Sequence, residues 1–405
     1  MQAVEIKPNI YWVGGIDWDI RNFHGYQTPR GTTYNAYLIK DEQTVLIDTV
    51  KNYMFDEMLE RIQSVVNPKD IDLIISNHVE MDHSGCLPHM QEIAPNAMVL
   101  TSTNGEKGLT KHYHSKLNIE VVSSGSIRSI GKRTLQFFHI PMVHWPDSMV
   151  TYSPKDHLLF PNDAFGQHLA SSQRFDDNFE WGILREEAAK YYANIVMPYG
   201  DQVIAALKAT QNLSIDMIAP SHGIIWRSHI PQIISEYKQW ASYASQPKAV
   251  IIYDSMWGST KKLAQVLFGS ISKQGIPVCL RNLSTTHYSD IVTDILDAQL
   301  ICFGSPTLNN GMMPSMGGFL TYLVGLRPRK KIGFVFGSYG WGGQAVGAMK
   351  AMLEPLSWEF PVEQVKVSYV PTDKDIDSMI KKGKELVNYI KKDGVATKRE
   401  VKCNV

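Results

Sequence analysis

A dense group of histidines and carboxylates follows an apolar run in the first quarter of the chain. His78, Glu80, Asp82 and His83 occupy four of six consecutive positions after the β-branched stretch that ends at Ser76. So many ionisable groups at the end of a buried strand are costly unless they are paired or bind a metal. In an extended segment His78, Glu80 and Asp82 share one side, while His83 points to another. The pattern therefore predicts two metals close together.

Three more potential ligands stand where later strands are expected to end. His144 follows the strand predicted over 134–140, Asp163 follows the one over 158–160, and His222 follows an apolar run that begins at Met217. Singly, each is more often an ordinary hydrogen-bonded residue. Together with the first cluster they complete a set of seven candidate metal ligands: His78, Glu80, Asp82, His83, His144, Asp163 and His222.

Three loops in the second half have the composition of a cofactor pocket. The first contains Ser255, Met256, Trp257, Gly258, Ser259 and Thr260, and its hydroxyls and backbone N–H groups at a helix start can hold one phosphate. The second contains Pro306, Thr307, Leu308, Asn309, Asn310 and Gly311, and the third Ser338, Tyr339, Gly340, Trp341, Gly342 and Gly343. Glycine lets backbone approach a flat ring, on which Tyr339 and Trp341 can pack. Neither a Gly-x-x-x-x-Gly-Lys loop nor a dinucleotide fingerprint occurs, which argues against nucleoside triphosphate and direct nicotinamide binding.

The elements that must position these residues change character near Gln246. Before it, many short strands with a few helices indicate α/β layers around a β-rich interior. After it, five strands alternate with five helices, which predicts a doubly wound parallel sheet. We therefore expect two domains, residues 1–246 for the metals and residues 247–405 for the cofactor.

Charge and composition narrow the class of protein. The 405 residues carry 40 basic and 40 acidic side chains, so neither nucleic acid nor anionic lipid is expected as a partner. Residues 1–10 show no basic stretch followed by an apolar one, and no apolar run approaches membrane length, so a cytoplasmic location is expected. The four scattered cysteines, Cys86, Cys279, Cys302 and Cys403, are expected to be reduced thiols. The basic tail from Lys392 is expected to be frayed or to contact a partner.

The ligand order and the three loops together resemble the flavodiiron proteins over nearly the whole chain. That resemblance implies a metallo-β-lactamase-like αβ/βα domain followed by a flavodoxin-like domain that binds FMN. It assigns His78, Glu80 and His144 to one iron, Asp82, His83 and His222 to the other, and Asp163 to the bridge. It also places Tyr192 and His24 beside the metals, where a phenol or imidazole could donate a proton or a hydrogen bond.

The same resemblance implies an oxidoreductase that reduces O2 to water, NO to nitrous oxide, or both. FMN stores two electrons and a ferrous pair two more, and the total of four matches the reduction of O2 to two waters. The electron donor stays open between a rubredoxin-type protein and a reduced deazaflavin coenzyme. The resemblance further implies a head-to-tail homodimer, which can pair again into a dimer of dimers.

One alternative is a metallo-β-lactamase-type hydrolase with an accessory flavodoxin domain. Hydrolytic zinc members of that fold carry histidine where this chain has Glu80. The exchange adds a third carboxylate to Asp82 and Asp163, and hard oxygen ligands favour iron or manganese over zinc. The other alternative, a plain electron-carrier flavoprotein, leaves the metal ligands without a use.

Overall fold

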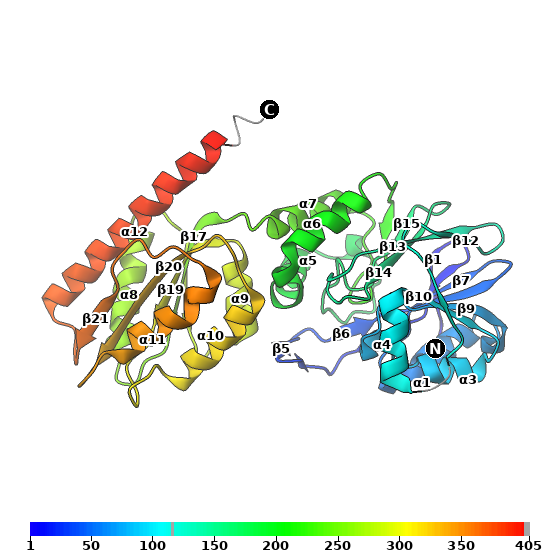
Figure 1. Cartoon of the computed structure of the whole chain (residues 1–405), viewed down its shortest axis with the longest axis horizontal. Helices are drawn as coiled ribbons and strands as arrows, with labels where there is room; N and C mark the ends of the chain where they lie inside the picture. The colour runs from blue at the N-terminus through cyan, green and yellow to red at the C-terminus, as the bar shows by residue number, and fades with distance from the viewer. Residues whose placement is uncertain (115–116, 401–405) are drawn as a thin grey trace. The chain divides into compact units, whose positions relative to one another are not determined.

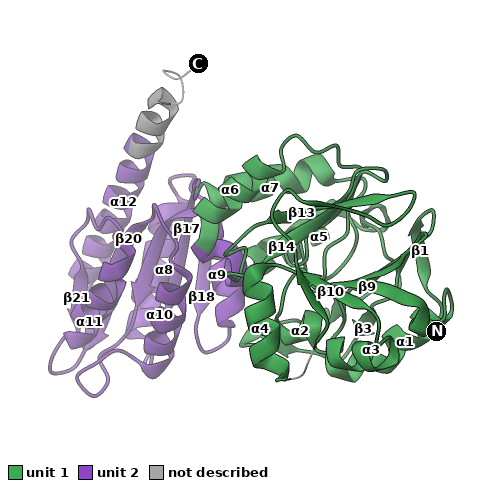
Figure 2. Ribbon diagram, turned by 45° about the vertical axis from the view of Figure 1, so that its right-hand side comes forward, with its two compact units in different colours: residues 1–192, 199–242 green, residues 193–198, 243–405 purple. Residues whose placement is uncertain are grey.

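The chain forms two compact units. The structure, a computed structural model, describes residues 1–114 and 117–400, with side chains described as far as residue 392. The first unit comprises Met1–Tyr192 and Tyr199–Ser242, and the second comprises Ala193–Pro198 and Tyr243–Val405 (Figure 2). The boundary expected after Gln246 falls inside strand β17 (Gln246–Tyr253) of the second unit, and the assignment of a function to each domain stays a prediction.

Two sheets form the centre of the first unit (Figure 1). The seven-stranded sheet has the order β1-β2-β7-β8-β9-β10-β11, and the five-stranded sheet has the order β12-β13-β14-β15-β16. The strands of the larger sheet are β1 (Val4–Lys7), β2 (Ile10–Trp12), β7 (Tyr37–Lys40), β8 (Thr44–Ile47), β9 (Ile71–Ile75), β10 (Met98–Thr101) and β11 (Ile119–Val121). Those of the smaller sheet are β12 (Ile127–Ser129), β13 (Thr134–His139), β14 (Met149–Ser153), β15 (Leu158–Phe160) and β16 (Met217–Ile218). Two short ribbons pair β3 (Gly15–Asp17) with β6 (Thr32–Tyr34) and β4 (Asn22–Phe23) with β5 (Tyr26–Gln27).

The two sheets pack face to face, because alternate apolar residues of both enter one core. Val45 and Leu73 of the larger sheet share this core with Phe137 and Phe160 of the smaller sheet. A second core lies on the outer face of the larger sheet, where Met58 and Leu109 cover it from helices. This αβ/βα layering agrees with the fold expected for the first half.

The helices of the first unit flank these sheets. They are α1 (Phe55–Gln63), α2 (Met81–Ser84), α3 (Leu87–Ile93), α4 (Thr103–Tyr113), α5 (Trp181–Tyr191), α6 (Gly200–Ala209) and α7 (Ile230–Ala241). After α5 the chain makes a π-helical turn, Tyr192–Val196, and most of that turn belongs to the second unit. Short 3-10 turns span Asn52–Met54, Pro68–Asp70, Asp176–Asn178, Met197–Tyr199 and Glu354–Leu356.

The second unit is a doubly wound parallel sheet, as predicted. Its strands β17, β18 (Val278–Asn282), β19 (Ala298–Gly304), β20 (Ile332–Tyr339) and β21 (Val365–Ser368) are all parallel in the order β18-β17-β19-β20-β21. Helices α8 (Ser259–Ser272) and α12 (Asp373–Glu400) pack together over one face (Figure 1). On the other face Phe319 of α10 (Pro314–Leu326) contacts Phe303, with α9 (Tyr288–Leu296) and α11 (Gln344–Leu353) beside α10.

Three further expectations concern the tail, the thiols and membranes. The tail is helical rather than frayed as far as Glu400, because α12 continues through Lys392, while residues 401–405 lie outside the described part of the chain. Cys86, Cys279 and Cys302 are free thiols, and Cys403 is among the residues not described. In the described part of the chain, no helix combines the length and the apolar character that a bilayer crossing requires.

Candidate metal centre and cofactor pocket

The first ligands lie on a loop and a short helix rather than on an extended strand. Strand β9 ends at Ile75, Glu80 stands at the N-cap of α2, and Asp82 and His83 lie within that helix. The extended geometry expected for His78 to His83 is therefore wrong. Two side-chain hydrogen bonds support this helix: Ser84 Oγ donates to Val79 O at 2.7 Å, and Thr49 Oγ1 donates to His83 O at 2.7 Å from another strand end. The helical turn brings His83 to the same centre as Asp82, which a strand would not do.

One group of side chains gathers around Glu80. Oε2 of Glu80 lies 3.4 Å from Nε2 of His78 and 3.4 Å from Nε2 of His144. Oδ2 of Asp163 closes the group, at 3.2 Å from His144 Nε2 and 3.7 Å from His78 Nε2. One ligand atom from each of these four residues lies within 4.8 Å of the others, which suits a single ion.

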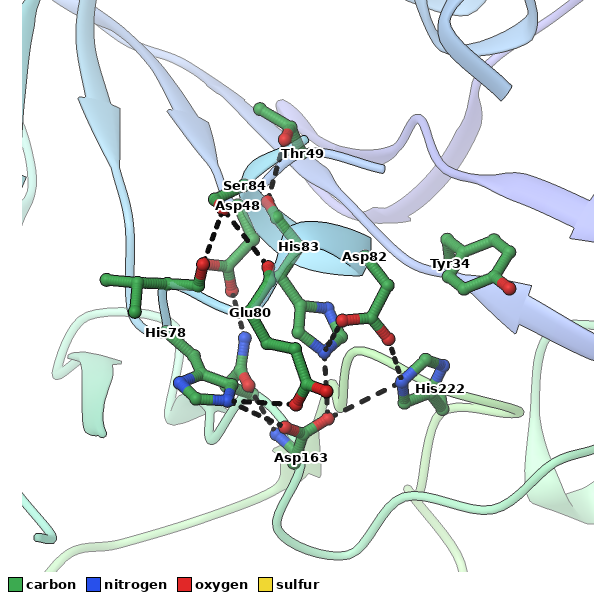
Figure 3. A network of polar contacts seen from close by, with 12 residues as sticks. Tyr34, Asp48, Thr49, His78, Glu80, Asp82, His83, Ser84, Asp163 and His222 are labelled. Atoms are coloured by element: carbon green, nitrogen blue, oxygen red, sulfur yellow. Dashed lines mark hydrogen bonds and ion pairs between the residues drawn. The ribbon is translucent and has the colours of Figure 1, made fainter. Parts of the chain in front are cut away.

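A second group adjoins the first across Asp163 (Figure 3). Nε2 of His222 lies 3.2 Å from Asp82 Oδ2, and Nε2 of His83 lies 3.4 Å from Asp82 Oδ1. Asp163 turns its other oxygen, Oδ1, to this side, at 3.0 Å from His83 Nε2 and 3.5 Å from His222 Nε2. Its two oxygens thus face one group each, which is the placement of a bridging carboxylate.

Hydrogen bonds at Nδ1 fix the orientation of two imidazole rings whose Nε2 atoms face the centre. His78 Nδ1 donates to Asp147 Oδ2 at 2.9 Å, and His222 Nδ1 donates to the carbonyl of Thr33 at 2.7 Å. A proton held on Nδ1 leaves the Nε2 lone pair free to face the centre, as in metal-ligating histidines. Asp147 also accepts the N–H of Val79 at 2.9 Å, so one buried carboxylate fixes both the ring and its backbone.

The residues present fit two metal ions. Nε2 of His78, both carboxylate oxygens of Asp82 and both ring nitrogens of His83 are buried and make no directed hydrogen bond, although all but His83 Nδ1 face an oppositely charged group. All three residues are at most 4% exposed. Buried polar atoms without a directed hydrogen bond cost up to about 1–3 kcal/mol each, a cost that metal coordination removes.

The electrostatics of the centre favour positive charge. Burial lowers the pKa of His78 and His144, but nearby carboxylates outweigh it, and each pKa is raised to about 10. Burial also lowers the pKa of His83, but Asp163 and Asp82 outweigh it and raise this pKa to about 9. Burial raises the pKa of Asp163, yet the surrounding histidines outweigh it and hold that pKa well below its ordinary value. Without metals the centre therefore holds protons where cations would otherwise lie.

A large pocket opens where the strands of the second unit end. It has a volume of about 780 Å³ and is lined by Met256, Trp257, Ser259, Pro306, Thr307, Leu308, Asn309, Asn310, Ser338, Tyr339, Gly340, Trp341, Gly342, Tyr369 and Val370. All three predicted loops contribute to it, at the carboxyl edge where parallel sheets bind ligands. Trp257 and Trp341 are 94% and 96% exposed, so both indoles are free to cover a flat ligand.

Five predicted pocket residues do not line it: Ser255, Gly258, Thr260, Gly311 and Gly343. Two of them support the first loop instead. Ser255 Oγ accepts the N–H of Gly258 at 3.1 Å, and the buried Thr260 hydroxyl bonds Ser338 Oγ at 2.8 Å. Tyr369 and Val370 line the pocket without having been predicted. Their position directly after β21 is the signal that could have found them.

Comparisons with known proteins match both units. A family model described as ODP family beta lactamase matches residues 32–223, and a flavodoxin model matches residues 251–383. The crystal structure of the flavodiiron protein from Giardia intestinalis superposes with a TM-score of 0.93 at 33% identity, covering 96% of this chain and 97% of that one. The chain belongs to the flavodiiron protein family. Rubredoxin oxygen:oxidoreductase from Desulfovibrio gigas superposes on this flavodiiron protein with a TM-score of 0.95 at 40% identity, covering 96% and 99%.

Its curated relatives include enzymes with different names. The nitric oxide reductase of Moorella thermoacetica is 44% identical, covering 95% of this chain and 98% of the relative. The coenzyme F420H(2) oxidase of Methanothermobacter marburgensis is 39% identical, covering 96% and 99%. This flavodiiron protein is accordingly an oxidoreductase, and the relatives do not support the hydrolase alternative.

Beside the metal centre of this flavodiiron protein, one of the two predicted neighbours is in place. His24 Nε2 lies 3.6 Å from Glu80 Oε1, with 74% of the side chain exposed. The predicted Tyr192 instead packs its ring against Tyr237 and Trp240. Its neighbour Tyr191 donates its hydroxyl to Asp163 Oδ1 at 3.0 Å, because consecutive residues of a helix point about 100° apart.

Two buried residues near the centre carry no signal of their own in the sequence. Asp48 accepts from the backbone N–H of Asn77 at 2.8 Å and from Asn162 Nδ2 at 3.1 Å, which joins the loop before His78 to the loop before Asp163. His168 packs against His222, with ring centroids 4.9 Å apart. Neither follows a recognisable pattern, although Asp48 does stand directly after β8.

Proposed function

We propose that this flavodiiron protein reduces dioxygen to water, nitric oxide to nitrous oxide, or both, at a non-heme diiron centre that receives electrons through FMN. One observation carries the proposal: two groups of candidate ligands share Asp163 in a chain that also has a flavodoxin unit with a large open pocket. Names of relatives support both substrates, since they include a nitric oxide reductase and a rubredoxin-oxygen oxidoreductase.

For the metals we propose the assignment that follows the two groups. His78, Glu80 and His144 hold one iron, Asp82, His83 and His222 hold the other, and Asp163 lies between them. The irons supply the binding site for the diatomic substrate and part of its electrons. Three carboxylates offset most of the charge of two divalent ions and favour iron or manganese over zinc.

The residues around the irons have proposed roles in orientation and proton supply. Asp147 and the Thr33 carbonyl hold the rings of His78 and His222 in place. Tyr191 holds Asp163 by its hydroxyl. His24 is open to water and close to Glu80, so its imidazole is placed to carry protons from solvent to the centre. Both gas reductions consume protons, which makes such a group useful at the mouth of the site.

In the second unit we propose that the three loops hold FMN. The start of α8 after Gly258 offers free N–H groups to the phosphate, and Ser259 lines the pocket at that point. Trp257, Tyr339 and Trp341 flank the ring system. On this assignment residues 1–246 are the diiron domain and residues 247–405 the FMN-binding domain.

The electron donor is proposed to be external and the location cytoplasmic. A rubredoxin-type protein and a reduced deazaflavin coenzyme are both candidates, because relatives are named for each. Anaerobic stopped-flow reduction of the bound FMN by each donor separates them: the physiological donor reduces the flavin within the turnover time, and the other does not.

The decisive experiment is metal and gas analysis of the protein produced in iron-rich medium. We expect two irons and one FMN per chain, and consumption of O2 or NO by the reduced protein. Zinc with hydrolytic activity would favour the metallo-β-lactamase alternative. Flavin without metal would favour a plain electron carrier.

For assembly we propose a head-to-tail homodimer in which the FMN of one subunit serves the iron pair of its partner. The separation of the flavin loops and the metal ligands into different units supports it. Reassembled mixtures of an iron-free chain (His78→Ala with His144→Ala) and a flavin-free chain test it. About half the dimers are then mixed and each has one complete pair of centres, so about a quarter of normal activity should return. Mixed dimers without activity would exclude transfer between subunits.

A further inference from the structure

A small apolar cavity lies behind the metal centre in the first unit. It has a volume of about 30 Å³ and lies between the outer face of the five-stranded sheet and helices α6 and α7. The sheet contributes Val150 and Leu159, and the helices contribute Val203, Leu207 and Tyr237. Apart from Thr210 and Tyr237, every side chain in its lining is apolar. We call this space the inner cavity.

The two polar side chains in that lining already have hydrogen-bond partners. Thr210 Oγ1 donates to the carbonyl of Ala206 at 3.0 Å, and the Tyr237 hydroxyl accepts the N–H of Phe165 at 2.7 Å. A buried water needs two to four hydrogen-bond partners, and cavities without them stay dry and admit xenon or similar apolar guests. The volume suits one small guest, such as a diatomic gas.

The inner cavity reaches the backbone that carries two metal ligands. Val143 and Ala164 both line it. Val143 directly precedes His144, and Ala164 directly follows Asp163. The inner cavity therefore borders the two loops that carry these ligands.

On its other side the inner cavity adjoins a groove that is open to solvent. This outer groove has a volume of about 530 Å³ and runs between α6 and α7. Leu159, Phe165, Leu207 and Thr210 line both spaces. Ile204, one turn before Leu207 on α6, lines only the outer groove and is 45% exposed. These four residues mark the junction between the two spaces, and Leu207 is the aliphatic side chain that α6 contributes to it.

We propose that the outer groove and the inner cavity form an entry route for an apolar diatomic gas to the metal centre, with Leu207 at its narrowest point. This inference rests on the proposed function, because O2 and NO are the gases that the centre would reduce. Both dissolve better in apolar surroundings than in water, so the inner cavity concentrates them beside His144 and Asp163. Water and ions are held back by the same lining.

The centre also has a polar side, where Glu80 is 18% exposed and His24 lies open to water. Gas entering there would not pass Leu207. The two routes make opposite predictions for substitutions on α6, a helix that carries none of the candidate ligands.

Xenon under pressure probes the inner cavity independently of activity. In crystals of the full-length protein we expect one xenon in the inner cavity of the parent. Leu207→Trp should fill the junction and remove this xenon. Ala205→Trp is the matched control, because Ala205 is an exposed residue of the same helix that lines neither space, and it should keep the xenon.

The kinetic test uses the pre-reduced protein with its iron and FMN contents measured. Mixed with O2 or NO in a stopped-flow apparatus, Leu207→Trp should react about tenfold more slowly than the parent, and Ala205→Trp at the parent rate. If Leu207→Trp does not fold, Leu207→Ala replaces it: the wider junction should raise xenon occupancy and leave the rate equal or faster.

Each result decides the matter. A parent without xenon in the inner cavity overturns the proposal, as does a Leu207→Trp protein that loses the xenon but reacts at the parent rate. A Leu207→Ala protein that reacts more slowly also overturns it. A parent that holds iron and FMN but consumes neither gas would refute the proposed function and with it the route, while the xenon map would still show whether the cavity takes an apolar guest.

Discussion

The contact between His78 and Asp147 makes a sharp test of how the metal centre is held. Asp147 is 4% exposed and accepts from His78 Nδ1 at 2.9 Å. Asp147→Asn keeps the shape and an acceptor for the Val79 N–H, but it removes the negative charge that orients the ring. A hydrogen bond to a charged group contributes about 1.5–3 kcal/mol, which corresponds to a loss of about 10- to 100-fold in metal affinity.

The assay is anaerobic competition of ferrous iron between the protein and a coloured chelator. The loss should fall on the ion held by His78, Glu80 and His144, so that intermediate chelator concentrations leave about one iron per chain. Asp156→Asn is the matched control, because Asp156 is a similarly enclosed carboxylate that binds Arg133 Nε at 3.0 Å. The control should retain both irons. Unchanged affinity in Asp147→Asn, or an equal loss in Asp156→Asn, would refute the reasoning.

Three further predictions concern protons, the flavodoxin unit and metal choice. His78 and His144 have pKa values raised to about 10, so iron must displace protons from them when it binds. The affinity for iron should therefore rise from about pH 6 to about pH 9. Calorimetry in two buffers should detect the released protons. These protons stabilise the metal-free fold fully below about pH 6.5, and the stabilisation is lost as pH rises through about 10. Gly337→Ala places a Cβ 2.2 Å from a backbone oxygen and should lower the free energy of unfolding by about 1–3 kcal/mol. Gly347→Ala lies on the open face of α11 and should raise it by about 0.5–1 kcal/mol. Thermal unfolding measures both. Glu80→His should shift retained metal from iron towards zinc in elemental analysis, and equal iron content would contradict the role given to its carboxylate.

Most ligands of the metal centre could be predicted, because the side chains that bind metals belong to a few residue types. His, Asp and Glu at the ends of apolar runs have few other reasons to gather, and all seven candidates do meet in space. The local backbone could not be predicted in the same way. Helix α2 depends on Thr49, which reaches His83 from another strand end, and such a tertiary contact leaves no periodic signal.

The error between Tyr191 and Tyr192 has a geometrical origin. Both stand at the end of α5, and a hydrophobic pattern gives the phase of a helix only to within about one residue. A change from α-helical to π-helical turns begins at Tyr192, which shifts that phase further. Tyr369 and Val370 were missed for a simpler reason: a short exposed pair after a strand contains no glycine or hydroxyl that would mark a cofactor loop.

The segment Ala193–Pro198 has a consequence for how this chain can be divided. It belongs to the second unit, where Asn194 Oδ1 accepts from Tyr322 and Asn194 Nδ2 donates to the carbonyl of Ser289, yet it stands between stretches of the first. The polypeptide therefore passes between the units three times rather than once. A fragment that begins after Ser242 would lack Ala193–Pro198, although these residues belong to the second unit. The fragment that ends at Ser242 would retain them. Recombination that exchanges whole flavodoxin units would also have to exchange these six residues, which lie within the first half of the sequence. Substitutions in the second unit therefore constrain the sequence of this segment.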